Sequence, residues 1–456
     1  MDMRRRVQRS KPAKGVTMRT RRANLRFTQD LDAMGGVLKV YSGKNYTCER
    51  GELKTVGGWR AVTNSEGQYY TLTGINPLEV GSMRVDVGNG KYQELCYIYT
   101  VAGGFLHYQP DSHTYYAVAA NRGRTVVQPV MGRDGTVLAV FTDKGFLIGG
   151  VSTAVETVIA ENTLAAGAYF KHRIFVAMKG GEVRYSAPEN FYNFEESPDE
   201  GGRIRFSNHG GEIVAMHVYD DALYIFFENG IMRLQASGEP SRFYAEQLDY
   251  AGGGILRRTI CICQNALYFM SLSGVYRVVG RRVERLPIEG LIPEKETGLE
   301  GGAVFEGRMI FRFCPSEGEA YKTVLLTADG RTYTEMNDLL GLGNFANGRV
   351  AFVDSAQRIA ELSRLGKLQF DPIANVMETD FGFAGKKFLT KIHLQGEGAG
   401  TLDIYCDGRC WSHSIVFENG GASIGMKLHG DIFAFTFSLS KNARIVGMQV
   451  EYKTRR

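Results

Sequence analysis

Short apolar runs separated by polar or glycine-containing turns recur along most of the chain. Each copy is typical of two strands joined by a tight turn. Five copies are regular: ELCYIYTVAGGFLHY (94–108), VLAVFTDKGFLIGG (137–150), RIFVAMKGGEVRYS (173–186), ALYIFFENGIMRLQ (222–235) and ALYFMSLSGVYRVVG (266–280). Two looser copies follow at 308–333 and 349–363. The pattern predicts seven β-hairpins.

The spacing of these hairpins indicates the fold. Their starts at 94, 137, 173, 222, 266, 308 and 349 lie 36 to 49 residues apart. A four-stranded propeller blade repeats at about 40–45 residues. Each hairpin is therefore expected to be the inner or central pair of one blade. Generic hairpins in a large sandwich or barrel are the alternative, but would not be expected to keep so even a period. We predict an all-β chain with a β-propeller of six to eight blades over 76–372.

Turn residues agree with this prediction. Lys179-Gly180-Gly181, Glu228-Asn229-Gly230 and Asp329-Gly330 place glycine where a hairpin turn needs a positive φ. Helix signals are weak, and the best of them predict short helices near 290–300 and 337–342.

The rhythm changes after Asp371-Pro372. Seven short apolar segments follow, separated by glycine-rich turns: ETDFGF, KFLTKIHLQ, TLDIYCDG, WSHSIVFE, SIGMKLHG, IFAFTFSLS and ARIVGMQVEY. About 80 residues with some seven strands are typical of a β-sandwich. We predict a sandwich over 373–456. Residues 27–75 also alternate as strands do, and are expected to lead into the propeller or to close it.

Charge separates the N-terminus from the rest. The net charge is +5, yet residues 1–26 carry ten basic residues against one Asp. The segment is thus +9 and the remainder −4, which predicts an extended basic arm over 1–26 that binds a partner. Ordering so polar a segment costs on the order of tens of kcal/mol, so a partner must hold it. The predicted contact residues are Arg4, Arg5, Arg6, Arg9, Lys11, Lys14, Arg19, Arg21, Arg22 and Arg26.

Composition excludes several other classes of protein. No stretch approaches the roughly 20 apolar residues that span a bilayer, and no apolar segment of a secretory signal follows the basic start. We therefore expect no membrane partner. The seven cysteines form no CxxC pair and are expected to be free thiols in a reduced compartment. Cys261 and Cys263 would share one face of a strand, which leaves a metal site there as the weaker alternative.

Candidate chemistry is sparse. The eight histidines form no HExxH motif, and no GxSxG elbow or phosphate-binding loop occurs. Asp220-Asp221 and Glu195-Glu196 are paired acids that could hold a cation or serve a glycosidase. Adjacent residues on a strand point apart, so solvated loop charges are the preferred interpretation. We expect no enzymatic activity, no catalytic residue, no metal and no cofactor.

Three stretches resemble the β-propeller tail proteins of bacteriophages, namely the hub, nozzle or stabilisation proteins that extend a head–tail connector. They are NLRFTQDLDAMGGVLKVYSGKNYTCERGELKTVGGW (24–59), HRIFVAMKGGEVRYSAPENFYNF (172–194), and the C-terminal KKFLTKIHLQGEGAGTLDIYCDG with RIVGMQVEY. The long arginine-rich extension before Asn24 is not part of the resemblance.

The resemblance implies a virion structural protein that forms a ring, of six copies, in a phage tail or neck and lines or extends the DNA conduit. It would be assembled in the host cytoplasm. The basic arm would then bind an adjacent connector or tail ring protein, or make non-specific contact with genomic DNA; we favour the protein. A carbohydrate- or receptor-binding propeller-sandwich is the alternative function, and a propeller glycosidase is a third.

Overall fold

The computed structural model describes most of the chain from Met18 to Arg455. The residues outside the description are 1–17, 30–36, 57, 89, 110–113, 120–121, 133–134, 151–154, 198–199, 208–209, 328–329, 364–371, 382, 441–442 and 456. The described residues form two compact units, one of residues 58–368 and one that combines residues 1–57 with 369–456. The chain is all-β, as predicted, with two short 3₁₀ turns, η1 (Pro240–Arg242) and η2 (Arg257–Thr259).

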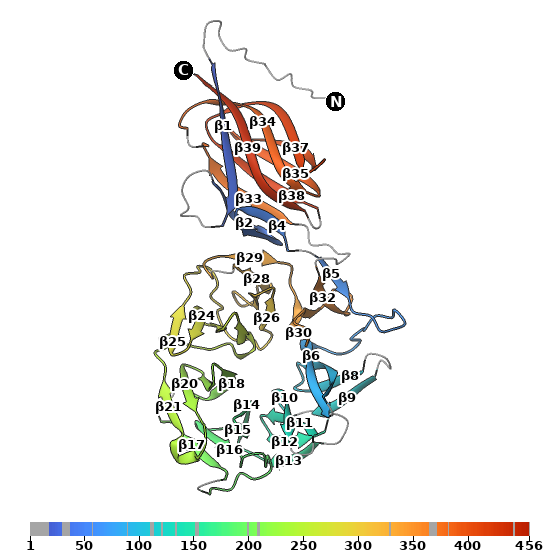
Figure 1. Ribbon diagram of the computed structural model, residues 1–456, viewed down its shortest axis with the longest axis vertical. Coiled ribbons are helices and arrows are strands. Elements are labelled where there is room, and N and C mark those ends of the chain that lie inside the picture. The colour runs from blue at the N-terminus through green and yellow to red at the C-terminus, as the bar shows by residue number, and fades with distance from the viewer. Residues whose placement is uncertain are drawn as a thin grey trace. The chain divides into compact units, whose positions relative to one another are not determined.

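Residues 58–368 form a seven-bladed β-propeller (Figure 1). The first three blades are β6 (Pro77–Gly88), β7 (Lys91–Thr100), β8 (Phe105–Gln109), β9 (Thr114–Ala119); β10 (Thr125–Gly132), β11 (Gly135–Thr142), β12 (Gly145–Gly149), β13 (Val155–Ile159); and β14 (Thr163–Phe170), β15 (Arg173–Met178), β16 (Glu182–Tyr185), β17 (Gly202–Arg205). The next two are β18 (Ile213–Tyr219), β19 (Ala222–Phe227), β20 (Gly230–Gln235), β21 (Tyr244–Gln247); and β22 (Cys261–Cys263), β23 (Ala266–Ser271), β24 (Gly274–Val279), β25 (Arg282–Arg285).

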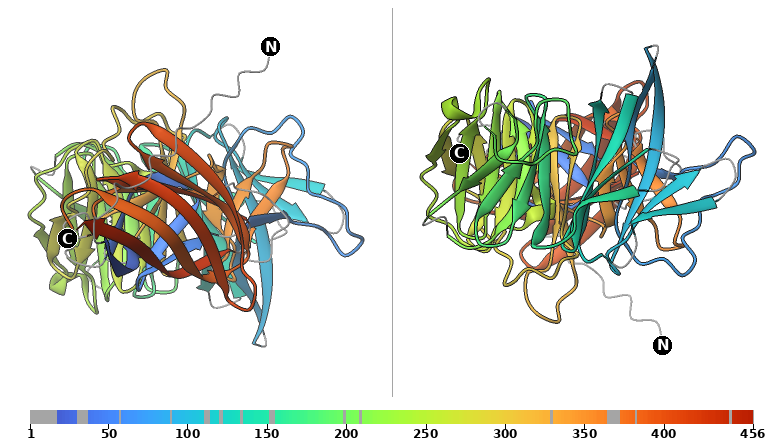
Figure 2. Two further views of the ribbon diagram at one scale, coloured as in Figure 1. Left: turned by 90° about the horizontal axis from the view of Figure 1, so that it is seen from above. Right: turned by 90° about the horizontal axis from the view of Figure 1, so that it is seen from below.

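The sixth blade is β26 (Gly301–Phe305), β27 (Arg308–Phe313), β28 (Lys322–Leu326) and β29 (Tyr333–Met336). The seventh is β30 (Leu340–Asn344), β31 (Val350–Val353), β32 (Ile359–Ser363) and β5 (Gly58–Ala61). Every blade is an antiparallel four-stranded sheet in which each strand pairs with the next one named above. In the view from below (Figure 2, right) the strands of the green blades stand side by side. The predicted hairpins are the second and third strands of the blades, so they are central pairs.

The turns and the helices were predicted with mixed success. Gly180 and Gly330 adopt φ of 76° and 66° as expected, but Gly230 begins β20 without a positive φ. The two predicted helices are wrong. Residues 290–300 form irregular backbone, and Leu340–Asn344 is the inner strand β30, because its apolar residues pack between blades rather than along a helix face.

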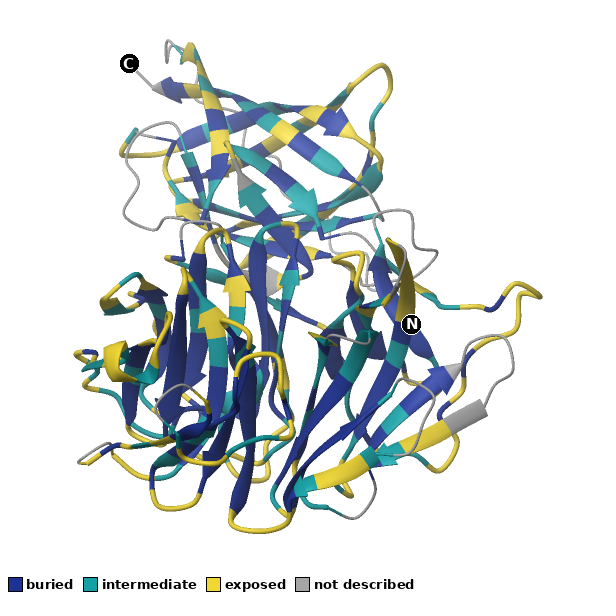
Figure 3. Cartoon of the chain, turned by 60° about the horizontal axis from the view of Figure 1, so that its bottom comes forward, coloured by how far each residue is buried: buried dark blue, intermediate teal, exposed yellow. Residues whose placement is uncertain are grey.

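Apolar side chains fill the spaces between neighbouring blades. Separate buried clusters join blade 1 to 2, 2 to 3, 3 to 4, 4 to 5, 5 to 6 and 7 to 1. In Figure 3 the middle strands of the blades are accordingly dark, and the connecting loops are exposed. Blades 6 and 7 are also tied by a side chain: the Asn344 amide accepts from the Val304 backbone N–H and donates to its carbonyl, both at 2.9 Å.

A strand from far back in the chain closes the ring. β5 pairs antiparallel with β32 and places Trp59 opposite Leu362. The Trp59 ring meets Phe352 of β31 edge to face at 5.7 Å. The last blade thus receives its outermost strand from a segment some 280 residues earlier than the other three, so the propeller cannot open without separating β5 from β32.

The second unit is a β-sandwich built from both ends of the chain. Its first sheet runs β37 (Gly421–Gly430), β34 (Lys387–Glu397), β39 (Arg444–Arg455), β1 (Met18–Thr28). β4 (Glu52–Thr55) pairs with the first residues of β39, and β3 (Tyr46–Glu49) pairs with β4. Its second sheet runs β2 (Val37–Lys44), β33 (Ile373–Thr379), β38 (Phe433–Leu439), β35 (Ala399–Cys406), β36 (Arg409–Val416).

Strand alternation in the sandwich follows the sequence pattern. Phe433, Phe435, Phe437 and Leu439 of β38 are buried, and the residues between them are half-buried. They share one core with β1, β2, β34 and β39. The segment ETDFGF is the least accurate of the predicted strands, since β33 ends at Thr379 and Phe381 follows in a turn.

The domain boundaries differ from the prediction. Residues 27–75 were expected to lead into the propeller or to close it. β5 does close it, but β1 to β4 belong to the sandwich. The arm predicted over 1–26 likewise overlaps β1. These errors have one physical cause: the partners of these strands, β39 and β32, lie hundreds of residues away, and local alternation predicts a strand without indicating its neighbour.

We expect replacement of Trp59 by alanine to weaken the ring closure. The substitution removes the ring contact with Phe352 and part of the packing of β5, which should lower the free energy of unfolding by about 2–3 kcal/mol. Urea unfolding followed by far-UV circular dichroism measures this. Tyr244→Ala is the control, since that ring is 55% exposed on blade 4. Equal losses in both variants would contradict the closing role of β5.

A half-buried histidine, His217, should make the propeller sensitive to acid. Burial lowers the pKa of His217 on β18 from 6.5 to about 4, and its ring packs edge to face on Phe226 at 6.2 Å. Between these pH values the unfolded chain binds a proton that the folded chain does not. Stability should therefore fall by up to about 3 kcal/mol as the pH drops from 6.5 to 4.

His217→Gln should remove that part of the pH dependence, as measured by unfolding at pH 7 and pH 4.5. His172→Gln, at an exposed position, should keep it. A pH profile that is the same in the wild type and in His217→Gln would show that this imidazole is not the cause.

Candidate functional site

The predicted basic arm divides into two parts in the structure. Six of the ten contact residues lie before Met18, outside the described residues: Arg4, Arg5, Arg6, Arg9, Lys11 and Lys14. The other four, Arg19, Arg21, Arg22 and Arg26, are on β1, a strand of the sandwich. Of the ten, the structure thus describes these last four, and it places them along one strand.

β1 is held by its own chain. Met18 to Leu25 pair antiparallel with Arg455 to Met448 of β39, and Arg26 to Thr28 pair in parallel with β2. Leu25 and Phe27 point into the core. The prediction of an extended arm is consequently wrong for residues 18–26. The strand was not predicted because only alternate positions face the core, and arginines occupy several of the others.

The arginines of β1 have contacts within the sandwich. Arg22 Nε donates to Glu451 Oε1 at 2.7 Å across β1 and β39. The Arg21 guanidinium lies 4.5 Å from the centre of the Phe383 ring. Along Met18–Leu25, β39 is the one described strand paired with β1, so the other edge of β1 has no strand partner within the described residues. Residues 1–17 therefore join the sandwich at the end of an edge strand.

The residues that carry the resemblance in blade 3 have architectural roles. The buried Arg173 donates to the backbone carbonyls of Ser186, at 2.8 Å, and Glu200. Ser186 Oγ accepts from the Ile174 N–H at 3.0 Å. Phe191 packs edge to face on Tyr169 at 5.7 Å. This motif fixes the long β16–β17 connection, so it is a signature of the blade and not of a chemical site.

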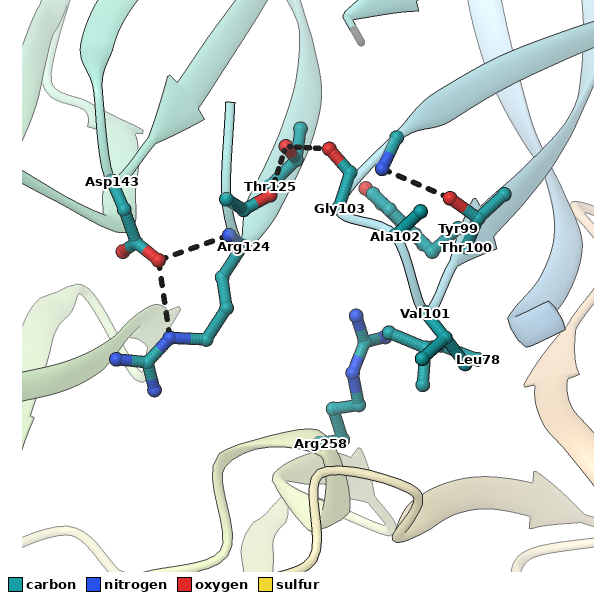
Figure 4. A pocket seen from close by; sticks show the side chains of 12 residues that line it. Leu78, Tyr99, Thr100, Val101, Ala102, Gly103, Arg124, Thr125, Asp143 and Arg258 are labelled. Carbon is teal, nitrogen blue, oxygen red and sulfur yellow. Dashed lines mark hydrogen bonds and ion pairs between the residues drawn. The ribbon is translucent and has the colours of Figure 1, made fainter. Parts of the chain in front are cut away.

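A cavity of about 250 Å³ lies at the axis of the propeller (Figure 4). Its walls come from the start of β6, the β7–β8 turn, the segment before β10, the β11–β12 turn and η2. These belong to blades 1 and 2 and to the entry into blade 5, and such distant blades can meet only near the axis. The lining residues are Leu78, Tyr99, Thr100, Val101, Ala102, Gly103, Gly104, Gly123, Arg124, Thr125, Asp143 and Arg258.

Glycine forms one wall of this cavity. Gly103 and Gly123 have φ of 78° and 76°, and a Cβ on Gly103 would lie 2.2 Å from the Gly123 carbonyl oxygen. The two turns can approach so closely only without side chains. Thr100 and Thr125 brace them, since Thr100 Oγ1 accepts from the Gly104 N–H at 3.0 Å and Thr125 Oγ1 donates to the Gly123 carbonyl at 3.3 Å.

Arginine side chains from two directions face the cavity. Arg258 reaches from η2 to Glu79 of β6, with Nη1 3.1 Å from Oε2. Arg124 Nε lies 3.2 Å from Asp143 Oδ2. In Figure 4 the Arg258 side chain rises from η2 toward Val101, and the Arg124 guanidinium lies below Asp143 on the other side of the open space. The Arg258 guanidinium also lies 5.4 Å from the Tyr99 ring centre.

Both carboxylates beside these arginines are already well occupied. Glu79 also accepts from the Tyr97 hydroxyl at 2.8 Å. Asp143 also accepts from the backbone N–H of Arg124 at 2.9 Å and of Ala165 at 3.1 Å. Burial and the Glu79 charge raise the pKa of Tyr97 well above 10. This tyrosine therefore stays protonated as a donor, and Glu79 is a poor candidate for a general base.

A second cavity of about 160 Å³ borders the first and shares Arg124 with it. Its remaining charged lining residues are Glu212, Glu228 and Glu296. Glu212 accepts from the Gly180 N–H at 3.1 Å. The first cavity is thus lined by two arginines and one aspartate, and the second by one arginine and three glutamates.

The other candidates from the sequence do not assemble into sites. Cys261 and Cys263 lie on β22 as free thiols, and burial raises the pKa of each. Asp220 and Asp221 form the β18–β19 turn, where Asp221 pairs with Lys171. Glu196 pairs with Arg203. Over the residues that the structure describes, no group of three or more His, Cys, Asp and Glu side chains could hold a metal ion.

Sequence reasoning missed the axial arginines. Arg257-Arg258 follows a glycine-rich stretch, which marks a connection between blades but not its position. Nothing in the local pattern could indicate that blades 1, 2 and 5 meet there, because that contact depends on the number of blades in the ring.

The fold and this cavity place the chain among seven-bladed β-propellers that carry a β-sandwich. No protein-family model matches the sequence, and no curated protein matches it either. Within the described residues no helix is long and apolar enough to cross a membrane.

The anchoring of β1 gives a stability prediction. Phe27 is 2% exposed and meets Phe437 edge to face at 5.4 Å. Phe27→Ala should lower the free energy of unfolding of the sandwich by about 3–5 kcal/mol, since it leaves a cavity in the core. Arg22→Gln, on the same strand but exposed, should cost less than about 1 kcal/mol. Denaturation monitored by Trp411 fluorescence in a Trp59→Phe background reports on this unit, and equal losses would show that β1 does not anchor the core.

Proposed function

We propose that the protein is a ring-forming structural subunit of a phage tail or neck, attached to a neighbouring ring through its basic N-terminal residues. The observation that supports this most is the position of β1. A strand fixed in the sandwich by β39 provides a rigid base for residues 1–17. That segment contains six basic residues and one Asp, a charge suited to an acidic surface.

The segment before β1 carries less positive charge than the predicted arm over 1–26. Residues 1–17 carry +5, so a ring of six copies would present about thirty positive charges from these segments instead of the larger number that an arm over 1–26 predicts. Two arginines of β1, Arg21 and Arg22, have their contacts within the sandwich. Specific contacts with a protein neighbour could hold six short segments in place, whereas a duplex that moves through the ring must not be held.

The DNA conduit of this proposal lies between copies. The Arg258–Glu79 ion pair crosses the axis of each propeller, so one chain does not provide an open passage. The motif residues Arg173 and Ser186 of blade 3 agree with an architectural protein, since they stabilise a loop.

Deleting residues 1–17 tests the proposal. Heads that carry a connector but lack this protein are mixed with the full chain or with the deletion variant, and bound protein is measured after sedimentation. The full chain should bind in a ratio fixed by the ring, and the deletion variant should lose at least tenfold in affinity while its unfolding midpoint stays unchanged. Prior nuclease treatment separates the partners, since a protein partner retains the binding and DNA does not.

A matched variant tests the role of charge. Replacement of the six basic residues before Met18 by glutamine should reproduce the deletion, whereas Gln8→Ala with Ser10→Ala should bind as the wild type does. Full binding by the deletion variant would refute attachment through this segment. A stable monomer that does not bind to the connector would refute the proposed ring.

One observation favours carbohydrate binding as a second function. A hollow of about 570 Å³ lies at the rim between blades 3 and 4 and includes Tyr185, Glu196, Arg203, Glu239 and Ser241. An aromatic ring with charged and hydroxyl groups can position a sugar. Binding to a glycan array that is lost in Arg203→Gln would support this function over the first.

A further inference from the structure

The axial cavity has more hydrogen-bond donors than the protein itself uses. The Glu79 and Asp143 carboxylates are satisfied by Tyr97, Arg258, Arg124 and backbone groups. In the part of the chain that the structure describes, Arg258 Nε is buried without a partner. Arg124 and Arg258 both line the cavity, and each guanidinium has more N–H groups than the one that its carboxylate accepts. Such a surplus of donors favours a ligand rich in acceptors.

A third arginine, Arg257, adds to the positive charge near the axial cavity. Arg257 precedes Arg258 on η2, and its side chain makes no hydrogen bond or ion pair with another described residue. Burial, together with the charges of Arg258 and Arg124, lowers its pKa to about 10. Glu296 and Asp143 oppose this effect, but each acts less strongly than either arginine. The neighbourhood of Arg257 is therefore short of negative charge.

The arginines are held rigidly in place. Thr259, which ends η2, is fully buried. Its hydroxyl donates to the Leu256 carbonyl at 2.6 Å and accepts from the Met270 N–H at 2.9 Å. This fixes the short turn against β23 before any ligand arrives. A preorganised pair of cations loses little conformational entropy when it binds an anion.

We propose that the axial cavity of the propeller binds an oxyanion, a phosphate or carboxylate group, between Arg124 and Arg258, with Arg257 adding positive charge. Guanidinium groups bind both kinds of oxyanion through paired hydrogen bonds. Leu78, Val101 and the Tyr99 ring form an apolar wall, which suits the carbon part of such a ligand. The proposal is independent of the attachment of residues 1–17.

Calorimetric titration of the full chain with sodium phosphate and with sodium acetate tests the proposal, in a chloride buffer of constant ionic strength. We expect saturable binding of one anion per chain and a rise in Tm on the order of 2–4 °C at about ten times the Kd. Tighter binding of phosphate identifies the group as a phosphate, and tighter binding of acetate identifies a carboxylate. Absence of saturable binding of either anion would overturn the proposal.

Two variants locate the site. Arg124→Gln should fold normally, since this side chain is half exposed, and should weaken anion binding at least tenfold. Arg257→Gln should also weaken it, because it removes a positive charge next to Arg258 and Arg124. Arg242→Gln on the exposed η1 is the control and should bind as the wild type does. Unchanged affinity in Arg124→Gln and Arg257→Gln would place the anion elsewhere and refute the axial site.

Discussion

The propeller depends on apolar packing between neighbouring blades, and this packing requires the ring of blades to be closed. No blade can bury both faces of its sheet alone, and the buried clusters lie between neighbours rather than within a blade. Each blade is therefore stable only as part of the full circle. The circle closes at the seventh blade, where β5 supplies the strand that the C-terminal repeat lacks. One β-pairing of distant segments thus completes the ring on which these interfaces depend.

The sandwich uses the same principle at the other end of the chain. Its first sheet is completed by β1 and its second by β2, while the remaining strands of these two sheets, apart from the short β3 and β4, come from the last 90 residues. The Arg444 guanidinium binds Glu52 of β4 and lowers the pKa of that carboxyl to about 2. Both units are therefore closed by N-terminal segments, and both need non-local pairing, which is typical of slow folding.

The polar centre of the propeller contrasts with its apolar interfaces. Residues from several blades face inward near the axis, and large side chains do not fill the space between them. Charged groups gather there: Arg124, Arg257 and Arg258 with Glu79 and Asp143. A buried ion pair contributes little to stability by itself, so the arrangement is better explained by a ligand than by the needs of the fold.

The sequence by itself determined the all-β class, the blade repeat and the alternation in β38, because these depend on hydrophobic period and turn residues over a few positions. It also located the basic N-terminus, but assigned Arg21 and Arg22 to a free arm. Only the tertiary structure decided that β1 pairs with β39, that β5 closes blade 7 and that Arg258 meets Glu79. The physical reason is that pairing of distant strands and convergence at an axis depend on the complete ring, whereas a local pattern specifies a strand without its partner.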